Sequence, residues 1–184
     1  MDKEIIYELS GILSHHWDEI IEKFNKHFSE NFSKLYLQSF REYTLDMKTQ
    51  DKTPLISGIF NTIMCIVLKD YGFTRRETDG YDFIYKTIKI EGKNTTSLDS
   101  SWTGNGYNKT NWHLLIKLSI DEDGLIKKSF CTFLPLDESY SKWTSPKEDS
   151  NFSTLKIDTK DYDTTIVVRG EFKKNPKFLG ILLG

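Results

Sequence analysis

The first half of the chain carries apolar residues at three- and four-residue spacing, which is the period of an α-helix. Three such stretches occur, over residues 3–27, 32–43 and 53–71. The third begins with Thr53-Pro54, a typical helix cap and first helical residue, and it ends before Gly72. Its apolar content predicts the most buried helix of the three, and the polar residues 45–52 before it predict a loop.

The second half of the chain changes to alternating, β-branched and aromatic stretches, which are typical of strands. The third helix is connected to them by residues 73–78. The strands are predicted over residues 81–85, 87–90, 113–120, 125–134, 153–157 and 164–172, with a turn at 121–124 and polar excursions at 94–112 and 136–151. Helices followed by strands indicate an α+β fold with a mixed or antiparallel central sheet.

One of these strands carries a candidate site. Side chains two residues apart share a face of a strand, so Lys89, Glu91 and Lys93 project to one side while Ile88 and Ile90 enter the core. A second carboxylate, from Asp82 or Asp79, stands at the start of the neighbouring strand. Two carboxylates beside a fixed ammonium group suit Mg²⁺, which binds one or two carboxylates together with water and phosphate oxygens. The alternative is a solvated strand face at Glu91 and Lys93, with Asp82 as a turn residue.

An Asp at the start of one strand, followed on the next by Glu91-Gly92-Lys93, resembles the PD-(D/E)XK nuclease motif of type II restriction endonucleases. The resemblance implies catalytic roles for Asp82, Glu91 and Lys93. It also implies one or two Mg²⁺ ions per subunit, held by Asp82 (or Asp79), Glu91 and the backbone carbonyl of Gly92. Neither Asp follows a Pro, which departs from the motif and leaves the choice of Asp open.

The implied fold is a restriction-endonuclease-like core, a mixed central sheet flanked by helices. A parallel strand pair needs a connection of a dozen or more residues, usually a helix. No crossover helix is predicted between residues 94 and 150, so the parallel pairing of such a core is in question here.

The segment after the motif, residues 94–112, is rich in hydrogen-bonding side chains. It also contains two glycines and three large aromatic residues. Such residues can contact base edges and phosphates, and in PD-(D/E)XK restriction enzymes the segment after the catalytic strand often carries DNA contacts. A plain surface loop is the alternative, and a solvated loop is likewise the alternative for the two arginines before the hairpin. The candidate DNA-binding residues are Asn94, Ser101, Trp102, Thr103, Asn105, Tyr107, Asn108, Lys109, Arg75 and Arg76.

Composition is that of an ordinary globular protein. The chain has 184 residues and a net charge of −2, which argues against a protein that coats nucleic acid through charge alone. We expect one nuclease domain, 1–184, made of a helical part (1–52), a catalytic core (53–134) and C-terminal strands (135–184). Two distant cysteines predict reduced thiols, and the N-terminus lacks a signal-peptide pattern. The apolar stretch 56–68 is too short and interrupted to span a bilayer, so we expect a cytoplasmic protein without a membrane partner.

The resemblance therefore implies a Mg²⁺-dependent, sequence-specific endonuclease that hydrolyses double-stranded DNA, a type II restriction enzyme. One small catalytic domain per subunit implies a homodimer on a short palindrome, with the first helix as the expected dimer surface. Two alternatives remain open. One is a repair or phage nuclease of the same fold, and the other is a non-enzymatic cytoplasmic binding module in which segment 94–112 recognises a protein or a sugar.

Overall fold

The computed structural model describes residues 2–31, 49–75, 81–96, 102–104, 112–121, 123–135, 153–155 and 166–168. The helices are α1 (Asp2–Asn31) and α3 (Thr49–Leu68), followed by a short 3₁₀ turn, η1 (Lys69–Tyr71). The strands are β1 (Phe73–Arg75), β2 (Phe83–Tyr85), β3 (Ile88–Thr95), β4 (Trp102–Gly104), β5 (Trp112–Ile120), β6 (Ile126–Pro135), β7 (Ser153–Leu155) and β8 (Ile166–Val168). The helix predicted over 32–43 lies outside the described residues.

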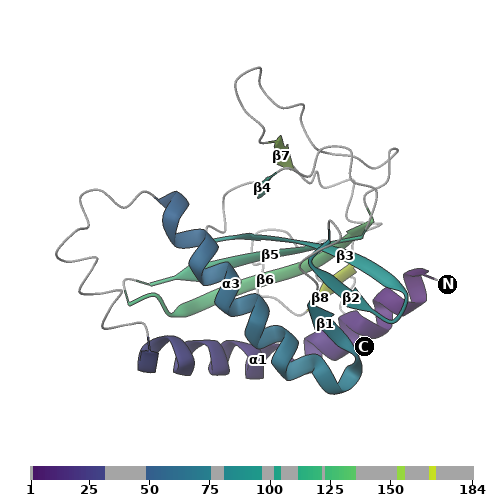
Figure 1. Ribbon diagram of the computed structural model, residues 1–184, viewed down its shortest axis with the longest axis horizontal. Coiled ribbons are helices and arrows are strands. Elements are labelled where there is room, and N and C mark those ends of the chain that lie inside the picture. Colours follow the sequence, from purple (N-terminus) through teal and green to yellow (C-terminus); the bar gives the residue numbers. More distant parts are fainter. Residues whose placement is uncertain are drawn as a thin grey trace.

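The main sheet has the strand order β1-β2-β3-β5-β6-β8 (Figure 1). The β3–β5 pair is parallel and every other pair in it is antiparallel, so the sheet is mixed and the fold is α+β, as predicted. Strand β1 is a correction, since residues 73–78 were predicted to be a connection. Three residues bounded by Gly72 and the hairpin carry too little periodicity to be recognised, and their pairing with β2 defines the strand.

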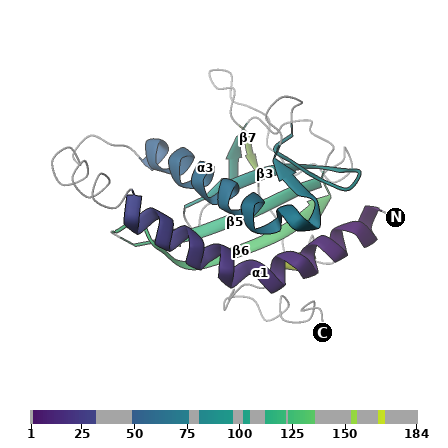
Figure 2. The same ribbon diagram turned by 60° about the horizontal axis from the view of Figure 1, so that its bottom comes forward.

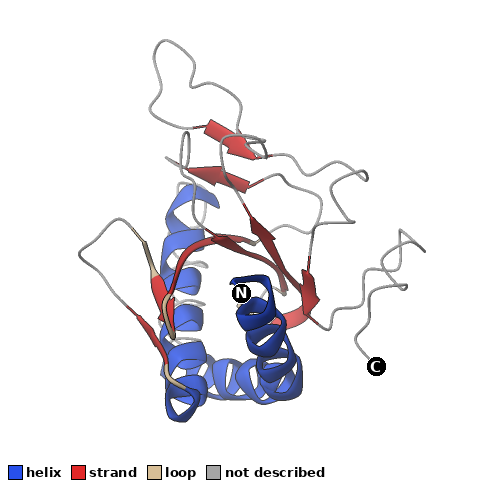
Figure 3. Ribbon diagram, turned by 90° about the vertical axis from the view of Figure 1, so that its right-hand side faces the viewer, coloured by secondary structure: helices blue, strands red, loops and turns tan. Residues whose placement is uncertain are grey.

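The parallel β3–β5 pair forms although no crossover helix was predicted between its strands. The connection over residues 96–111 is long enough for a parallel crossover, and its described part is strand β4. β4 pairs with β7 in a separate two-stranded sheet. Figure 3 shows this small sheet on the side of the main sheet away from α1.

Helices α1 and α3 pack against each other and against the other face of the main sheet (Figure 2). The buried side chains of α1 recur at helical spacing, which confirms the amphipathic pattern: Ile6, Leu9, Leu13, Trp17, Ile20, Phe24 and Phe28. This stripe lies inside the core of the chain. The stripe itself is therefore not free to contact a partner, while a dimer through the exposed face of α1 stays a prediction.

Helix α3 differs from its prediction at its start. It begins at Thr49 rather than at Thr53, so residues 49–52 are helical and Pro54 lies inside the first turns. Pro54 is the sixth residue of the helix and lies beyond the first four, whose N–H groups have no partner within a helix, so this part of α3 lacks one backbone hydrogen bond. The C-terminal prediction is confirmed, because Gly72 ends η1 in the left-handed conformation with a φ of 82°.

Helix α3 is also less buried than predicted. Ile56, Phe60, Met64 and Leu68 enter the core, but Leu55 is 44% exposed and Ile66 is 55% exposed. Residues Thr53–Tyr71, with a mean hydropathy of 1.2, are long and apolar enough to cross a membrane by length and composition alone, and only 28% of that window is buried. The core helix of a soluble protein meets the same criteria, so the expectation that the stretch 56–68 does not span a bilayer stays a prediction. The buried side chains of α3 pack against the main sheet.

The tip of the β5–β6 hairpin is fastened to α1. Asn25 donates from Nδ2 to the carbonyl of Ile126 (3.0 Å) and accepts from the Ile126 N–H (2.8 Å). In the predicted turn, Gly124 has a φ of 79° and lies against Phe28. Burial acts to raise the pKa of Asp121, but hydrogen bonds from Leu125, Lys127 and Asp123 outweigh it and the pKa is lowered.

Candidate functional site

Strand β3 presents the predicted polar residues on the face of the sheet opposite the helices. Ile88 and Ile90 lie in the core beneath α1 and α3, as alternation required. Lys89 is exposed, and its Nζ lies 4.9 Å from the centre of the Tyr81 ring. Glu91 is only 3% exposed and the Lys93 side chain 14%. The alternative of a solvated strand face is therefore wrong for Glu91 and Lys93.

Glu91 and Lys93 form an ion pair between Oε1 and Nζ. Their neighbours on the same face come from β5, because the parallel register sets Glu91 beside His113 and Lys93 beside Leu115. Both of these neighbours are fully buried. The pair thus lies in a setting of low polarity, where charges interact more strongly than in water and where their desolvation is costly.

Asp82 lies immediately before the first residue of β2, beside β3. Its N–H donates to the carbonyl of Ile90 (3.1 Å), and its Oδ2 accepts a hydrogen bond from the N–H of Gly92 (2.8 Å). The carboxylate thus replaces the backbone partner that a longer β2 would give to Gly92. Since both backbone groups of one residue in a strand face the same neighbouring strand, the Gly92 carbonyl also faces the side on which Asp82 lies.

Gly92 is required by this packing. A Cβ at this position would lie 2.6 Å from Cε2 of Phe83 and 3.4 Å from Oδ2 of Asp82. The absence of a side chain at Gly92 lets Asp82 and the Phe83 ring approach β3 closely. The Gly in Glu91-Gly92-Lys93 therefore has a structural reason that the motif alone does not give.

The oxygen atoms of this site determine which divalent cation could bind there. Among the described residues, no group of three His, Cys, Asp or Glu side chains could hold a metal ion. The site offers the Asp82 carboxylate and the Gly92 carbonyl on one side of β3, and the Glu91 carboxylate on the adjoining residue. Two carboxylates and a carbonyl fit Mg²⁺, which completes its octahedron with water and phosphate, better than a cation that needs a full set of protein ligands.

The other predicted site residues fall in different places. Asn94 points to the helix side, where its Nδ2 donates to Oδ1 of Asn61 (2.9 Å). Arg75 is also on that side, with Nη1 donating to Oγ1 of Thr62 (3.1 Å). Neither is brought to Glu91. Asp79, Arg76, Ser101, Asn105, Tyr107, Asn108 and Lys109 lie outside the described residues.

Trp102 was predicted to contact DNA, and the structure gives it another position. Its ring is 4% exposed, its Nε1 donates to the carbonyl of Ile116 (3.1 Å), and Nζ of Lys117 lies 4.5 Å from the ring centre. Trp102 therefore anchors β4, with Thr103 next to it, on the Glu91 face of the sheet. The parallel register also sets His113 beside Glu91, and no local pattern in the sequence determines that pairing.

The geometry comes without support from relatives. A comparison with models of known protein families finds none that matches this chain. A comparison with curated proteins finds no match either.

Proposed function

We propose that the chain is a Mg²⁺-dependent DNA endonuclease of the PD-(D/E)XK type, with Asp82, Glu91 and Lys93 as its catalytic residues. The observation that carries the proposal is the burial of the Glu91–Lys93 pair one residue away from the Asp82–Gly92 contact.

Burial of this pair has no evident benefit for stability. Two buried charges lose their hydration, and replacing such a pair with apolar residues is often neutral or stabilising. Buried ionisable groups gathered on neighbouring strands are instead typical of functional sites, although structural ion pairs also occur. The alternative interpretation of the sequence, in which Glu91 and Lys93 are ordinary surface charges, does not agree with this burial.

The order and direction of the strands also support the proposal. The candidate residues lie on an antiparallel hairpin, β2–β3, and the catalytic strand then pairs in parallel with β5. That arrangement agrees with the core expected from the resemblance. The restriction-endonuclease-like core itself remains part of the proposal.

Mg²⁺ bound at Asp82, Glu91 and the Gly92 carbonyl would neutralise charge on the phosphoryl oxygens and lower the pKa of a water molecule. Lys93 supplies a fixed ammonium group that stabilises negative charge as it develops at the phosphate. Asp82, Gly92 and Lys93 are partly exposed while Glu91 is buried. The phosphate would thus approach from the start of β2, where Asp82 lies.

The remaining parts of the proposal follow from the size of the chain. One domain with one site cuts one strand, so cleavage of both strands of a short palindrome requires a homodimer. We propose a type II restriction enzyme that acts in the cytoplasm. A repair or phage nuclease with the same site would differ in its products, because it would not cut at one repeated palindrome.

The first experiment incubates supercoiled plasmid DNA with the purified chain in Mg²⁺ or in EDTA. The proposal predicts discrete fragments in Mg²⁺ alone, and their sequenced ends would give the recognition site. Intact DNA under all salts would overturn it. Asp82→Asn should abolish cleavage while Asp79→Asn should not, since Asp82 is the acid in contact with Gly92.

A second candidate function is favoured by one observation. The direct contact of Glu91 with Lys93 is also what a purely structural pair would show. In that case the chain is a non-enzymatic binding module. The stability measurements described in the Discussion separate the two.

A further inference from the structure

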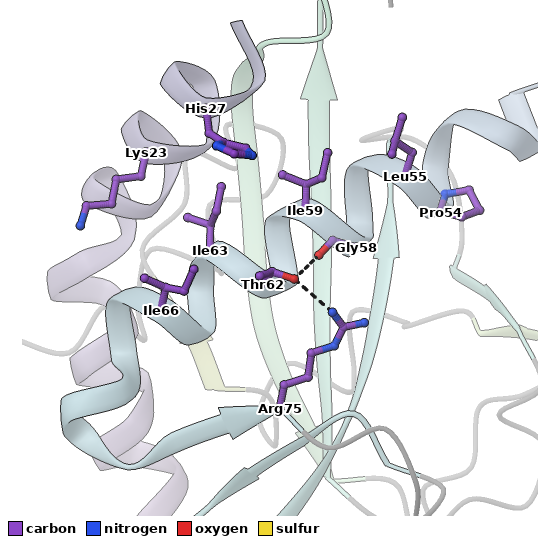
Figure 4. A pocket seen from close by; sticks show the side chains of 10 residues that line it. All are labelled: Lys23, His27, Pro54, Leu55, Gly58, Ile59, Thr62, Ile63, Ile66 and Arg75. Carbon is purple, nitrogen blue, oxygen red and sulfur yellow. Dashed lines mark hydrogen bonds between the residues drawn. The ribbon is translucent and has the colours of Figure 1, made fainter. Parts of the chain in front are cut away.

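A groove of about 590 Å³ runs between α1 and α3 on the outside of the molecule, on the helix side of the sheet. Figure 4 shows apolar residues of α3 along it, with Lys23 and His27 of α1 on one side and Arg75 on the other. The apolar residues are Leu55, Ile59, Ile63 and Ile66, with Pro54 at one end. The groove is separate from the proposed catalytic residues, which lie on the opposite face.

The shape of the groove suits a helix. Leu55, Ile59 and Ile66 form a stripe at helical spacing, and from first to last it measures about 16 Å, or three turns of an α-helix. Gly58 lies in the middle, and a Cβ added there would meet nothing within 4 Å. The missing side chain at Gly58 deepens the groove where a partner's apolar side chain would enter.

The charged side chains that line the groove are positive. Among the described residues, its lining contains the cationic side chains of Lys23 and Arg75, together with His27 and no acidic side chain. Arg75 is fixed at the rim, because its Nη1 donates to Oγ1 of Thr62, which in turn donates to the Gly58 carbonyl (2.8 Å). Lys23 pairs with Glu19 on its own helix (3.1 Å), but an exposed pair of this kind is weak and does not cancel the attraction for another acid.

We infer that this groove binds an amphipathic helix of another protein, with apolar residues along one face and acidic residues flanking them. The exposed apolar residues of α3 give a helix a surface to pack on, and a helix laid in a groove is a recurrent mode of recognition. The basic rim selects acidic flanks by charge complementarity. The inference is independent of the nuclease proposal and would hold if that proposal failed.

The test uses the full chain and a labelled helical peptide of about 12 residues. The peptide has Leu every three or four residues and Glu at the flanking positions. A matched peptide carries Lys in place of Glu, and binding is followed by fluorescence anisotropy. We expect the acidic peptide to bind and the basic peptide to bind at least about tenfold more weakly, and Arg75→Gln should reduce that preference.

Two variants at one position locate the binding. Gly58→Trp places a large side chain in the groove, and its Cβ would meet nothing within 4 Å, so the variant should abolish binding. Gly58→Ala leaves the groove open, and since Ala is the better helix former it should keep the fold and the affinity. Circular dichroism and a thermal melt of both variants confirm that they fold.

Several results would overturn the inference. They are failure of the acidic peptide to bind, equal binding by Gly58→Trp, and equal affinity for both peptides. Sedimentation equilibrium that showed a dimer dissociated by Gly58→Trp would assign the groove to a second copy of this chain. Binding of anionic phosphatidylserine vesicles that the same variant removes would assign it to a membrane surface.

Discussion

Removing one charge from the buried Glu91–Lys93 pair should lower the free energy of unfolding by a different amount for each residue. In Lys93→Met the Glu91 carboxylate, only 3% exposed, loses the charge of the Lys93 ammonium, and the free energy of unfolding should fall by about 3 kcal/mol. In Glu91→Gln the Lys93 ammonium is left, but its side chain is 14% exposed and can turn toward water, so we expect a loss of only about 1–2 kcal/mol. The double variant removes both charges and should lie within about 1 kcal/mol of the wild type.

Urea unfolding followed by circular dichroism measures these free energies, first in EDTA and then in Mg²⁺. If Glu91 and Asp82 share a cation, Mg²⁺ should stabilise Lys93→Met, by about 1.4 kcal/mol when its concentration is ten times its Kd. Glu91→Gln has lost one of the two carboxylates and should gain much less. This comparison detects the metal without any measurement of cleavage.

The reasoning would be refuted by single variants that both lie within about 0.5 kcal/mol of the wild type, because a desolvated pair cannot lose one charge at so small a cost. A different outcome would favour the structural alternative. If the stability pattern appears as expected but Mg²⁺ stabilises neither the wild type nor Lys93→Met, Glu91 and Lys93 form a pair without a metal site.

Three further predictions test the surroundings of the site and the fold. Gly92→Ala should lower the free energy of unfolding by about 1–3 kcal/mol in urea, and reduce cleavage, because its Cβ would lie 2.6 Å from the Phe83 ring. Gly124→Ala should cost at least as much in a thermal melt, because its Cβ would meet Phe28 at 2.4 Å at a φ of 79°; an unchanged Tm would contradict this. The pKa of Asp121 is lowered in the folded state, so its stabilising contribution is present above the unfolded pKa and is lost as the pH falls through the folded pKa. Asp121→Asn should therefore flatten the acid limb of stability against pH, and an unaltered limb would argue against it.

The sequence predicted most of what local periodicity determines. The alternation at Ile88, Lys89 and Ile90 fixed which residues of β3 enter the core, and the acidic turn before Gly124 identified the β5–β6 hairpin. Helix α1 was predicted from spacing alone, because its apolar stripe is continuous. These features depend on neighbours in the sequence and therefore need no knowledge of the fold.

The burial of the site could not be predicted in the same way. Alternation assigned Glu91 and Lys93 to one face, but a polar strand face is usually exposed, and the β5 neighbours and β4 that surround this one come from distant residues. The parallel pairing has the same origin. Asn94 and Trp102 suited a DNA-contacting loop by composition, and only the packing shows that they contact Asn61 and the Ile116 carbonyl.

The outer face of α3 illustrates a different limit. Helical spacing predicts that a helix has a buried stripe, yet Leu55 and Ile66 extend the apolar surface beyond that stripe. Helical spacing cannot distinguish apolar residues that enter the core of the chain from apolar residues on its surface that contact another molecule. The groove could therefore be recognised only from the structure.

The central claim is that Lys93 acts in cleavage, and two lysines of β3 offer a matched test. Lys93→Ala and Lys89→Ala change the same residue type on the same face of one strand, and of these two lysines Lys93 is the one that pairs with Glu91. The measurement is the initial rate of Mg²⁺-dependent plasmid cleavage by each variant and by the wild type. The account predicts that Lys89→Ala cuts at close to the wild-type rate while Lys93→Ala, still folded by circular dichroism, does not cut. Cleavage by Lys93→Ala at the wild-type rate would contradict it.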